Sequence, residues 1–302
     1  MHILLIFVDG IGLGADDPAI NPFAATNTPT LQSLAGGQRW LKSTPRTDSA
    51  RALFIPTDPR LGVPGDPQSA SNQAVIMTGR NVPAEIGEHY GPKPNPPIRA
   101  ILAQDNLYKQ LFARGKRSAL LDAYPPGFHR GIDSGKRLRS SLQQAAYEAG
   151  VPIRKVEDFY AGQALSADFT GQGWRDHLGY PDAPVFSPAQ AGARMADLAR
   201  AYDFSLFSTW ITDEIGHHQE MDRGIAYLEL FDQVMAGLLD AWKDDDGLVI
   251  ITSDHGNLED LSVRHHTTND VPTVIIGAAR NIFAEGFTSL MDITPGILRM
   301  LK

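Results

Sequence analysis

The sequence predicts an α/β protein with a mostly parallel central sheet and helices on both faces of that sheet. Short apolar runs of strand length recur along the 302 residues and alternate with stretches of helical periodicity. The runs at residues 3–8, 248–252 and 273–276 are apolar at nearly every position, which is typical of strands that are buried on both faces. Buried strands that alternate with helices favour a parallel sheet.

Five strands and two helices can be placed along the chain. The strands are expected at residues 3–8, 118–122, 204–208, 248–252 and 273–276. A helix is expected from Leu107 to Arg114, because the apolar spacing there stops at Gly115, a usual C-cap residue. A second helix is expected from Asp222 to Trp242, where apolar residues recur on one face.

Two stretches interrupt this alternation. Residues 62–97 are rich in Pro, Gly and Asn and are expected to form loops around one short helix. Residues 124–188 are more polar, and we expect them to form a small cap inserted in a core made of residues 1–123 and 189–302. The cap holds four basic residues, Arg130, Lys136, Arg137 and Arg139. These either contact substrate anions or form a solvated basic face, which is the commoner case for a run of charge.

The composition excludes several classes of site and partner. The chain has no cysteine, which excludes disulfides, thiolate chemistry, Fe–S clusters and Cys-type zinc sites. Its formal net charge of -8 argues against binding nucleic acid or an anionic membrane, since either would require clustered Lys and Arg. A small anionic substrate stays compatible with this charge, because divalent cations reverse the local field.

The first ten residues carry no sign of a targeting segment. They lack a basic region and a small-residue cleavage site, and the apolar run at residues 3–8 is too short to span a bilayer. We therefore expect the mature protein to start here and to stay in the cytoplasm.

Acidic and histidine side chains lie just after three of the predicted strands and in the loop that enters the strand at residues 273–276. They are Asp9, Asp213, His217, Asp254, His255, His265 and His266. Taken singly, each is also typical of an ordinary turn or surface position. Three strand ends that each deliver Asp or His nevertheless favour a shared site, because ligands bind at the carboxyl edge of open α/β sheets. Oxygen and nitrogen donors that converge from separate segments suit divalent metal ions.

A glycine-rich run follows the first predicted strand. Gly10, Gly12 and Gly14 resemble a dinucleotide-binding loop in composition only, because the third glycine comes one residue too early for the Gly-x-Gly-x-x-Gly spacing. No acidic residue suited to a ribose follows a second strand. We therefore do not expect a dinucleotide cofactor.

A serine is expected at the start of the short helix within residues 62–97. Ser69 is predicted as the N-cap of a helix that ends near Gly79. Backbone N–H groups and the positive end of the helix dipole lie near such an oxygen and suit an alkoxide and an incoming phosphate. A metal ion bound to this oxygen would lower its pKa and make it a usable nucleophile.

Seven short motifs follow one another from the N-terminus to the C-terminus. They are Asp9-Gly10, Asn27-Thr28-Pro29-Thr30-Leu31, Ser69 ten residues before Gly79, Asp213-Glu214-Ile215-Gly216-His217, Ser253-Asp254-His255-Gly256-Asn257, the stretch from His266 to Pro272, and Met291-Asp292-Ile293-Thr294-Pro295. In this order they resemble the alkaline phosphatase superfamily, which includes nucleotide pyrophosphatase/phosphodiesterases, cofactor-independent phosphoglycerate mutase and phosphopentomutase. The motifs at residues 253–257 and 266–272 look closest to the phosphoglycerate mutase branch.

The resemblance implies two divalent metal ions, zinc or manganese. One would be held by Asp213, His217 and His266, and the other by Asp9, Asp254 and His255, with Ser69 on or between the metals. Asn72 occupies the place of a phosphate-binding Asn in the phosphodiesterase branch. His218 and His265 adjoin ligands and are expected to support them or to face solvent.

The function that the resemblance implies is hydrolysis of a small phosphate-type ester, as a phosphatase or phosphodiesterase, through a phosphoserine on Ser69. A phosphomutase is the alternative, although the chain has no room for the large insert of phosphoglycerate mutase. A metal- or phosphate-binding protein without turnover is a third reading, disfavoured because every expected ligand is present. Sulfatase chemistry is not expected, since Ser69-Ala70-Ser71-Asn72 lacks the Pro and Arg of that signature.

Overall fold

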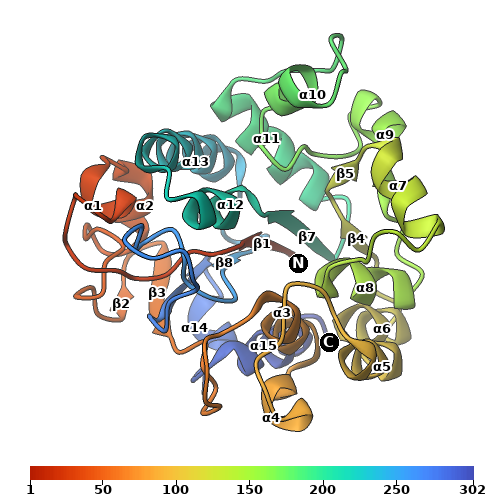
Figure 1. Cartoon of the computed structure of the whole chain (residues 1–302), viewed down its shortest axis with the longest axis horizontal. Coiled ribbons are helices and arrows are strands. Elements are labelled where there is room, and N and C mark those ends of the chain that lie inside the picture. The colour runs from red at the N-terminus through yellow and green to blue at the C-terminus, as the bar shows by residue number, and fades with distance from the viewer.

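The computed structural model describes residues 1–302, and Figure 1 shows a central sheet with helices on either side of it. The sheet has seven strands, in the spatial order β2 (Thr47–Asp48), β3 (Ala52–Thr57), β9 (Val271–Ile276), β8 (Gly247–Thr252), β1 (His2–Val8), β7 (Phe204–Thr209) and β4 (Ser118–Leu120). Strands β8, β1, β7 and β4 run parallel to one another. The α/β fold class and all five predicted strands are confirmed.

One side of the sheet departs from the parallel arrangement. β9 pairs with β8 in the antiparallel sense, β3 pairs with β9 likewise, and the two-residue strand β2 pairs with β3. β2 and β3 were not predicted, and the direction of β9 could not be, because a fully buried strand has the same pattern in both directions. Since β9 runs against β8, its amino end lies at the carboxyl edge of β8, and the loop that enters β9 arrives at that edge.

One face of the sheet is covered by helices from two separate parts of the chain. They are α1 (Pro22–Ala25), α2 (Pro29–Leu34), α11 (Pro188–Ala199), α12 (Ile211–His218) and α13 (Met221–Ala241). Leu4, Ile6 and Val8 of β1 point into this layer. α13 confirms the helix predicted from Asp222 to Trp242. No helix in the chain, α13 included, combines the length and the apolar character needed to cross a membrane.

The opposite face carries the helix with the predicted nucleophile. Its layer contains α3 (Ser69–Thr78), α5 (Pro96–Gln104), α6 (Leu107–Ala113), α8 (Ser141–Glu148), α14 (Arg280–Phe283) and α15 (Ile293–Met300). Every residue of α3 is buried, so its polar side chains must find partners inside the protein. The expectation of a single short helix in residues 62–97 is wrong: α3 and α4 (Val82–Ile86) both form there, and α5 begins at Pro96.

Residues 124–188 form several short elements. After β5 (Ala123–Tyr124) come α7 (Pro126–Asp133), α8, β6 (Arg154–Lys155), α9 (Val156–Tyr160) and α10 (Gln172–His177). Leu142, Ala145 and Ala146 of α8 belong to the same apolar core as α3. A separate small apolar cluster joins Ala123 to residues of α9 and α10. The division of the chain into a core and a cap at residues 124 and 188 stays a prediction.

Candidate metal centre

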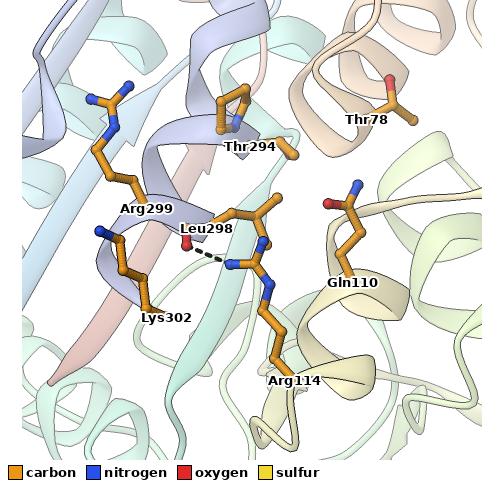
Figure 2. A pocket seen from close by; sticks show the side chains of 8 residues that line it. Thr78, Gln110, Arg114, Thr294, Leu298, Arg299 and Lys302 are labelled. Atoms are coloured by element: carbon orange, nitrogen blue, oxygen red, sulfur yellow. Dashed lines mark hydrogen bonds between the residues drawn. The ribbon is translucent and has the colours of Figure 1, made fainter.

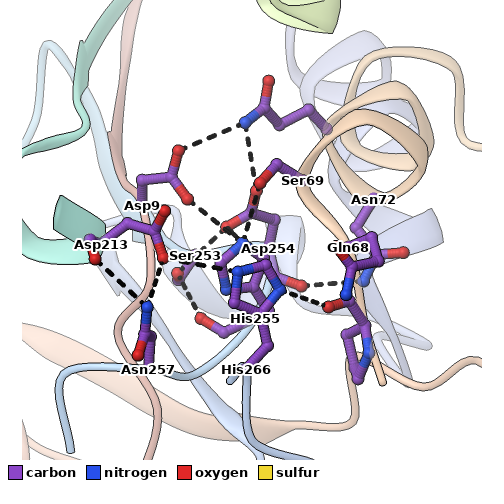
Figure 3. Close-up of polar contacts among 12 residues, drawn as sticks. Asp9, Gln68, Ser69, Asn72, Asp213, Ser253, Asp254, His255, Asn257 and His266 are labelled. Carbon is purple, nitrogen blue, oxygen red and sulfur yellow. Dashed lines mark hydrogen bonds and ion pairs between the residues drawn. The ribbon is translucent and has the colours of Figure 1, made fainter. Parts of the chain in front are cut away.

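Side chains from three neighbouring strands meet at the carboxyl edge of the sheet (Figure 3). Asp9 follows β1, Asp213 lies in α12 just after β7, and Asp254 and His255 follow β8. β1 lies between β7 and β8, and the N–H of Asp9 continues the ladder by donating to Thr209 O at 2.9 Å. Adjacent parallel strands therefore deliver these side chains to one place.

Asp213, His217 and His266 form the first of two groups, here called the Asp213 group. His217 Nε2 lies 3.3 Å from Asp213 Oδ2, and His266 Nε2 lies 3.6 Å from Asp213 Oδ1. The two Nε2 atoms are 3.3 Å apart. One ligand atom from each residue lies within 4.8 Å of the others, a spacing that could hold a metal ion.

The outer contacts of the Asp213 group turn its donor atoms inward. His217 Nδ1 lies 2.8 Å from Arg264 O, and His266 Nδ1 lies 2.8 Å from Pro67 O. A carbonyl oxygen only accepts, so each Nδ1 must carry the hydrogen, which leaves each Nε2 with a free lone pair when the ring is neutral. Asn257 Nδ2 donates to Asp213 Oδ1 at 2.8 Å and fixes that carboxylate.

Asp9, Asp254 and His255 form the second group, here called the Asp9 group. His255 Nε2 lies 3.3 Å from Asp9 Oδ1 and 3.7 Å from Asp254 Oδ1. Asp9 Oδ1 is buried and receives no hydrogen bond. A buried carboxylate oxygen of this kind is stabilised by a bound cation. Ligand atoms of Asp9, Asp213 and His255 also lie within 4.8 Å of one another, which places Asp213 between the two groups.

The three carboxylates repel one another. Burial raises the pKa of Asp9 well above its ordinary value, and the charges of Asp254 and Asp213 raise it further. Burial also raises the pKa of Asp254 to about 7, again with a contribution from Asp213. Burial acts in the same sense on Asp213, but the hydrogen bond with His217 and the neighbouring histidines outweigh it and lower its pKa. The centre therefore needs added positive charge to keep all three groups ionised.

The histidines differ in charge. Burial lowers the pKa of His255 to about 4 and that of His266 to about 4, so both rings are neutral at pH 7 and in the form that binds metals. The hydrogen bond to Asp213 raises the pKa of His217 to about 9, so this ring must lose a proton before it can bind a metal.

The donor set fits divalent metal ions. It combines three carboxylates, neutral imidazoles with oriented Nε2 atoms, and a buried carboxylate oxygen that lacks a partner. Hard oxygen and borderline nitrogen donors of this kind suit both zinc and manganese. The structure thus brings together all six Asp and His residues expected to hold the two ions.

Ser69 lies beside the Asp9 group. Its Oγ is 3.0 Å from His255 Nε2, and the side chain is almost completely buried. Ser69 is the first residue of α3, and Gln68 is the N-cap, one position earlier than expected from the sequence. Helix boundaries are uncertain by a residue or two when judged from sequence alone. The hydroxyl therefore lies at the amino end of the helix, within the candidate metal centre.

Two neighbours of Ser69 on α3 hold the loop after β8. Asn72 Nδ2 donates to Pro59 O and to Asp254 O, both at 2.8 Å. These bonds use both amide hydrogens to position backbone, and the role of Asn72 in binding phosphate stays a prediction. Gln73, one helical turn after Ser69, donates from Nε2 to Asp254 Oδ2 at 3.1 Å. Gln73 was not singled out from the sequence, although the i, i+4 spacing places it on the face of Ser69.

Glu259 was also not predicted. It is a buried carboxylate that hydrogen-bonds to three loops around the site. Its Oε2 accepts from the N–H of Gly12 at 3.0 Å and from that of Asn257 at 2.8 Å. Its Oε1 accepts from Asn269 Nδ2 at 3.1 Å and from Thr267 Oγ1. A Cβ at Gly12 would lie 2.3 Å from Glu259 Oε1, so the close approach of this carboxylate explains the glycine. The glycine run thus serves packing in the metal centre.

The two remaining histidines near the predicted ligands face solvent. His265 and His218 are both exposed, and His218 Nδ1 lies 2.9 Å from Glu214 O within its own helix. Neither forms a hydrogen bond or an ion pair with a side chain of the two groups.

A surface hollow of about 620 Å³ lies away from the centre (Figure 2). Thr78 lines it at the carboxyl end of α3, whereas Ser69 lies at the amino end of the same helix. Arg114, Arg299 and Lys302 also line it, but Arg114 donates to Leu298 O and Arg299 donates to carbonyls at the end of α14. The hollow is therefore separate from the candidate metal centre.

Comparisons with known proteins agree with this architecture. The structure resembles the PH0037 protein from Pyrococcus horikoshii, at a TM-score of 0.59 and 15% identity over 99% of this chain and 96% of that one. It also resembles the alkaline phosphatase from the Antarctic bacterium TAB5, at a TM-score of 0.55 and 14% identity over 99% of this chain and 97% of that one. At these identities the likeness concerns the fold.

Sequence comparison adds a relative and a family. A 2,3-bisphosphoglycerate-independent phosphoglycerate mutase of Methylobacillus flagellatus is 34% identical over 113 residues, which are 35% of this chain and 22% of that protein. The matched stretch thus spans less than a quarter of that relative. The model of the Metalloenzyme superfamily matches residues 126–302, more than half of the chain. The chain therefore belongs to the metalloenzyme superfamily and has an alkaline phosphatase-like fold.

Proposed function

We propose that the chain is a two-metal hydrolase of small phosphate-type esters in which Ser69 is the nucleophile. The observation that carries the proposal is the position of Ser69 Oγ, at the amino end of α3 and 3.0 Å from His255 Nε2 in the Asp9 group. A hydroxyl placed among carboxylates and neutral imidazoles has little structural purpose, whereas a nucleophile needs these surroundings.

Each residue has a role in this proposal. The Asp213 group would hold one metal ion and the Asp9 group the other, zinc or manganese. When bound, the two ions supply positive charge that lowers the pKa of the Ser69 hydroxyl and offsets the charge of the phosphate. Gln73 and Asn257 orient the carboxylates of Asp254 and Asp213.

The chemistry has two steps. Ser69 Oγ attacks phosphorus in line with the ester oxygen, so the Oγ–P bond forms, the P–O ester bond breaks and the alcohol leaves. Water then hydrolyses the phosphoserine and restores the serine. The N–H groups and dipole at the amino end of α3 stabilise the negative charge that gathers on the phosphoryl oxygens.

The test uses metal-stripped protein to which Zn²⁺ or Mn²⁺ is restored separately. Hydrolysis of 4-nitrophenyl phosphate and bis-4-nitrophenyl phosphate is measured for the wild type, for Ser69→Ala and for Ser71→Ala. Ser71 is a matched control on the same helical turn, because its hydroxyl hydrogen-bonds to backbone atoms of Gln68 and Tyr90. We expect metal-dependent turnover that Ser69→Ala abolishes, by at least about 10³-fold, and Ser71→Ala retains. Metal-dependent turnover that survives in Ser69→Ala would refute the assignment.

A phosphomutase is the second candidate, favoured by the name of the Methylobacillus flagellatus relative. It shares the phosphoserine but returns the phosphate to a second hydroxyl of the same substrate. Mass spectrometry of Ser69 after incubation with sugar phosphates, together with an assay for free phosphate, separates the two. Phosphorylated Ser69 without release of phosphate would indicate the mutase. Protein that does not bind two metals, does not turn over an ester and does not become phosphorylated would indicate a binding protein without turnover.

A further inference from the structure

Gln219 follows the helix that carries two members of the Asp213 group, and its backbone is strained. It is the C-cap of α12, with a φ of +57° in the left-handed region. Side chains rarely adopt this conformation, and it destabilises the chain unless other contacts compensate. The left-handed C-caps of α3 and α4 are glycines, Gly79 and Gly87, as is usual at such helix ends. A glutamine at the end of α12 therefore calls attention to what its side chain contacts.

The side chain of Gln219 bridges an exposed segment, residues 262–265. Its Nε2 donates to Leu261 O at 2.7 Å, and its Oε1 accepts from Arg264 Nε at 2.9 Å. Leu261 is fixed, because its side chain is buried and its N–H donates to Ile20 O at 2.8 Å. Every residue of the segment 262–265 is exposed, so it has no core packing to hold it. Gln219 thus fastens this segment to the end of α12.

The segment 262–265 is connected to both histidines of the Asp213 group. His217 Nδ1 donates to Arg264 O at 2.8 Å, and this bond leaves Nε2 of the ring free for a metal ion. His266 comes directly after the segment in the chain. A shift of Arg264 would therefore release the ring of His217 and move the backbone next to His266.

We propose that Gln219 is a positioning residue of the Asp213 group, which acts through Arg264 to hold His217 and His266 in the arrangement that binds a metal ion. Histidines that are already oriented lose less freedom when the ion binds, which strengthens binding. Gln219 makes no contact with the Asp9 group, so only one of the two ions should depend on it. This inference rests on the proposed function, because the Asp213 group is assigned there as the ligands of that ion.

Metal affinity is the first test. Zn²⁺ and Mn²⁺ are titrated separately, by calorimetry, into metal-stripped wild type, Gln219→Gly and Gln219→Asn. Both substitutes tolerate a positive φ, but glycine has no side chain and that of asparagine is one methylene shorter. In both variants we expect one of the two ions to bind about tenfold more weakly and the other to bind within about twofold of wild type. Gln38→Gly, at an exposed loop glutamine, is the control and should bind both ions as wild type does.

Folding stability separates a positioning role from a purely structural one. Glycine adopts a positive φ without strain, so metal-free Gln219→Gly should unfold at the same urea concentration as wild type or at a higher one. A glutamine that served only the fold would give the reverse, a lower midpoint with unchanged metal binding. Arg264→Ala removes the partner of Gln219 and keeps the carbonyl that His217 contacts. The double variant should bind the ion no more weakly than Gln219→Gly alone, because the two residues act in one chain of contacts.

Limited digestion with trypsin gives a readout that needs no metal. Trypsin cleaves after Arg264 only when the segment 262–265 opens, so metal-free Gln219→Gly should be cleaved there at least about threefold faster than wild type. Cleavage after Arg39, which is also exposed, is the internal control and should not change. Equal cleavage and equal metal affinity in variant and wild type would overturn the inference and leave the hydrolase unaffected. Wild type that binds fewer than two ions would overturn the two-metal centre together with this role of Gln219.

Discussion

Replacing Asp254 by asparagine should stabilise the metal-free protein at alkaline pH. Asp254 is completely buried, and its pKa is raised by burial from an ordinary value of 3.8 to about 7. Its ionised form is therefore disfavoured in the folded state and not in the unfolded state. A group with a raised pKa favours folding fully below pH 3.8, and that contribution is lost as the pH rises through about 7.

The size of the effect follows from the shift. Three pKa units at about 1.4 kcal/mol each give about 4 kcal/mol above pH 7, and less than half of that at pH 5. Asparagine preserves the acceptor for Gln73 Nε2, which now donates to Asp254 Oδ2 at 3.1 Å, and its own amide could donate to Asp9. We expect metal-free Asp254→Asn to exceed the wild type in free energy of unfolding by about 2–4 kcal/mol at pH 8, and by about 1 kcal/mol at pH 5.

Urea denaturation of chelator-treated protein at pH 5 and pH 8 measures this difference. Asp245→Asn, at an exposed position, is the control and should change stability by less than about 0.5 kcal/mol at both values. Adding metal should reverse the order, because wild type gains about 2.7 kcal/mol when the free metal is at 100 times its dissociation constant, and the variant has lost a ligand. A variant that is less stable than wild type by the same amount at both pH values would refute the reasoning.

Three further predictions concern the surroundings of the centre. Glu259→Gln should lower the free energy of unfolding in urea by about 1–3 kcal/mol, because an amide N–H would then face the donors of Gly12 or Asn257. Unchanged stability would show that the hydrogen bonds of Glu259 do not hold these loops together. His217→Ala should reduce the metal content from two ions to one, counted by elemental analysis after dialysis, and loss of both ions would show that the groups are not separable. Asn72→Ala should lower the free energy of unfolding by about 2 kcal/mol with KM nearly unchanged, since both its amide hydrogens bind backbone carbonyls; a raised KM with unchanged stability would favour phosphate binding instead.

The parts of the centre that the sequence predicted share one physical origin. β1 and β8 are apolar along nearly all of their length, β7 is mostly buried, and neighbouring strands of a parallel sheet end at the same edge. Asp9, Asp213 and Asp254 follow directly from that rule. His266 does not, because it lies in a loop that enters a strand. It reaches the carboxyl edge only because β9 runs antiparallel to β8, a direction that hydrophobic patterning does not record.

The parts that were missed depend on contacts between distant segments. Glu259 hydrogen-bonds to the N–H of Gly12, 247 positions away, and Gln73 to Asp254, 181 positions away. Glu259 in a polar stretch has the local pattern of a solvated acid, and Gln73 that of an ordinary helical residue.

The charge balance of the candidate centre decides how much substrate charge it can accommodate. Asp9, Asp213 and Asp254 contribute three negative charges when ionised, and two divalent ions contribute four positive ones. One positive charge remains, and the alkoxide of Ser69 would cancel it. A phosphate ester brings up to two negative charges into this neutral centre, and a second anionic group brings more. The backbone N–H groups and the positive dipole end of α3, which begins at Ser69, also favour such charge.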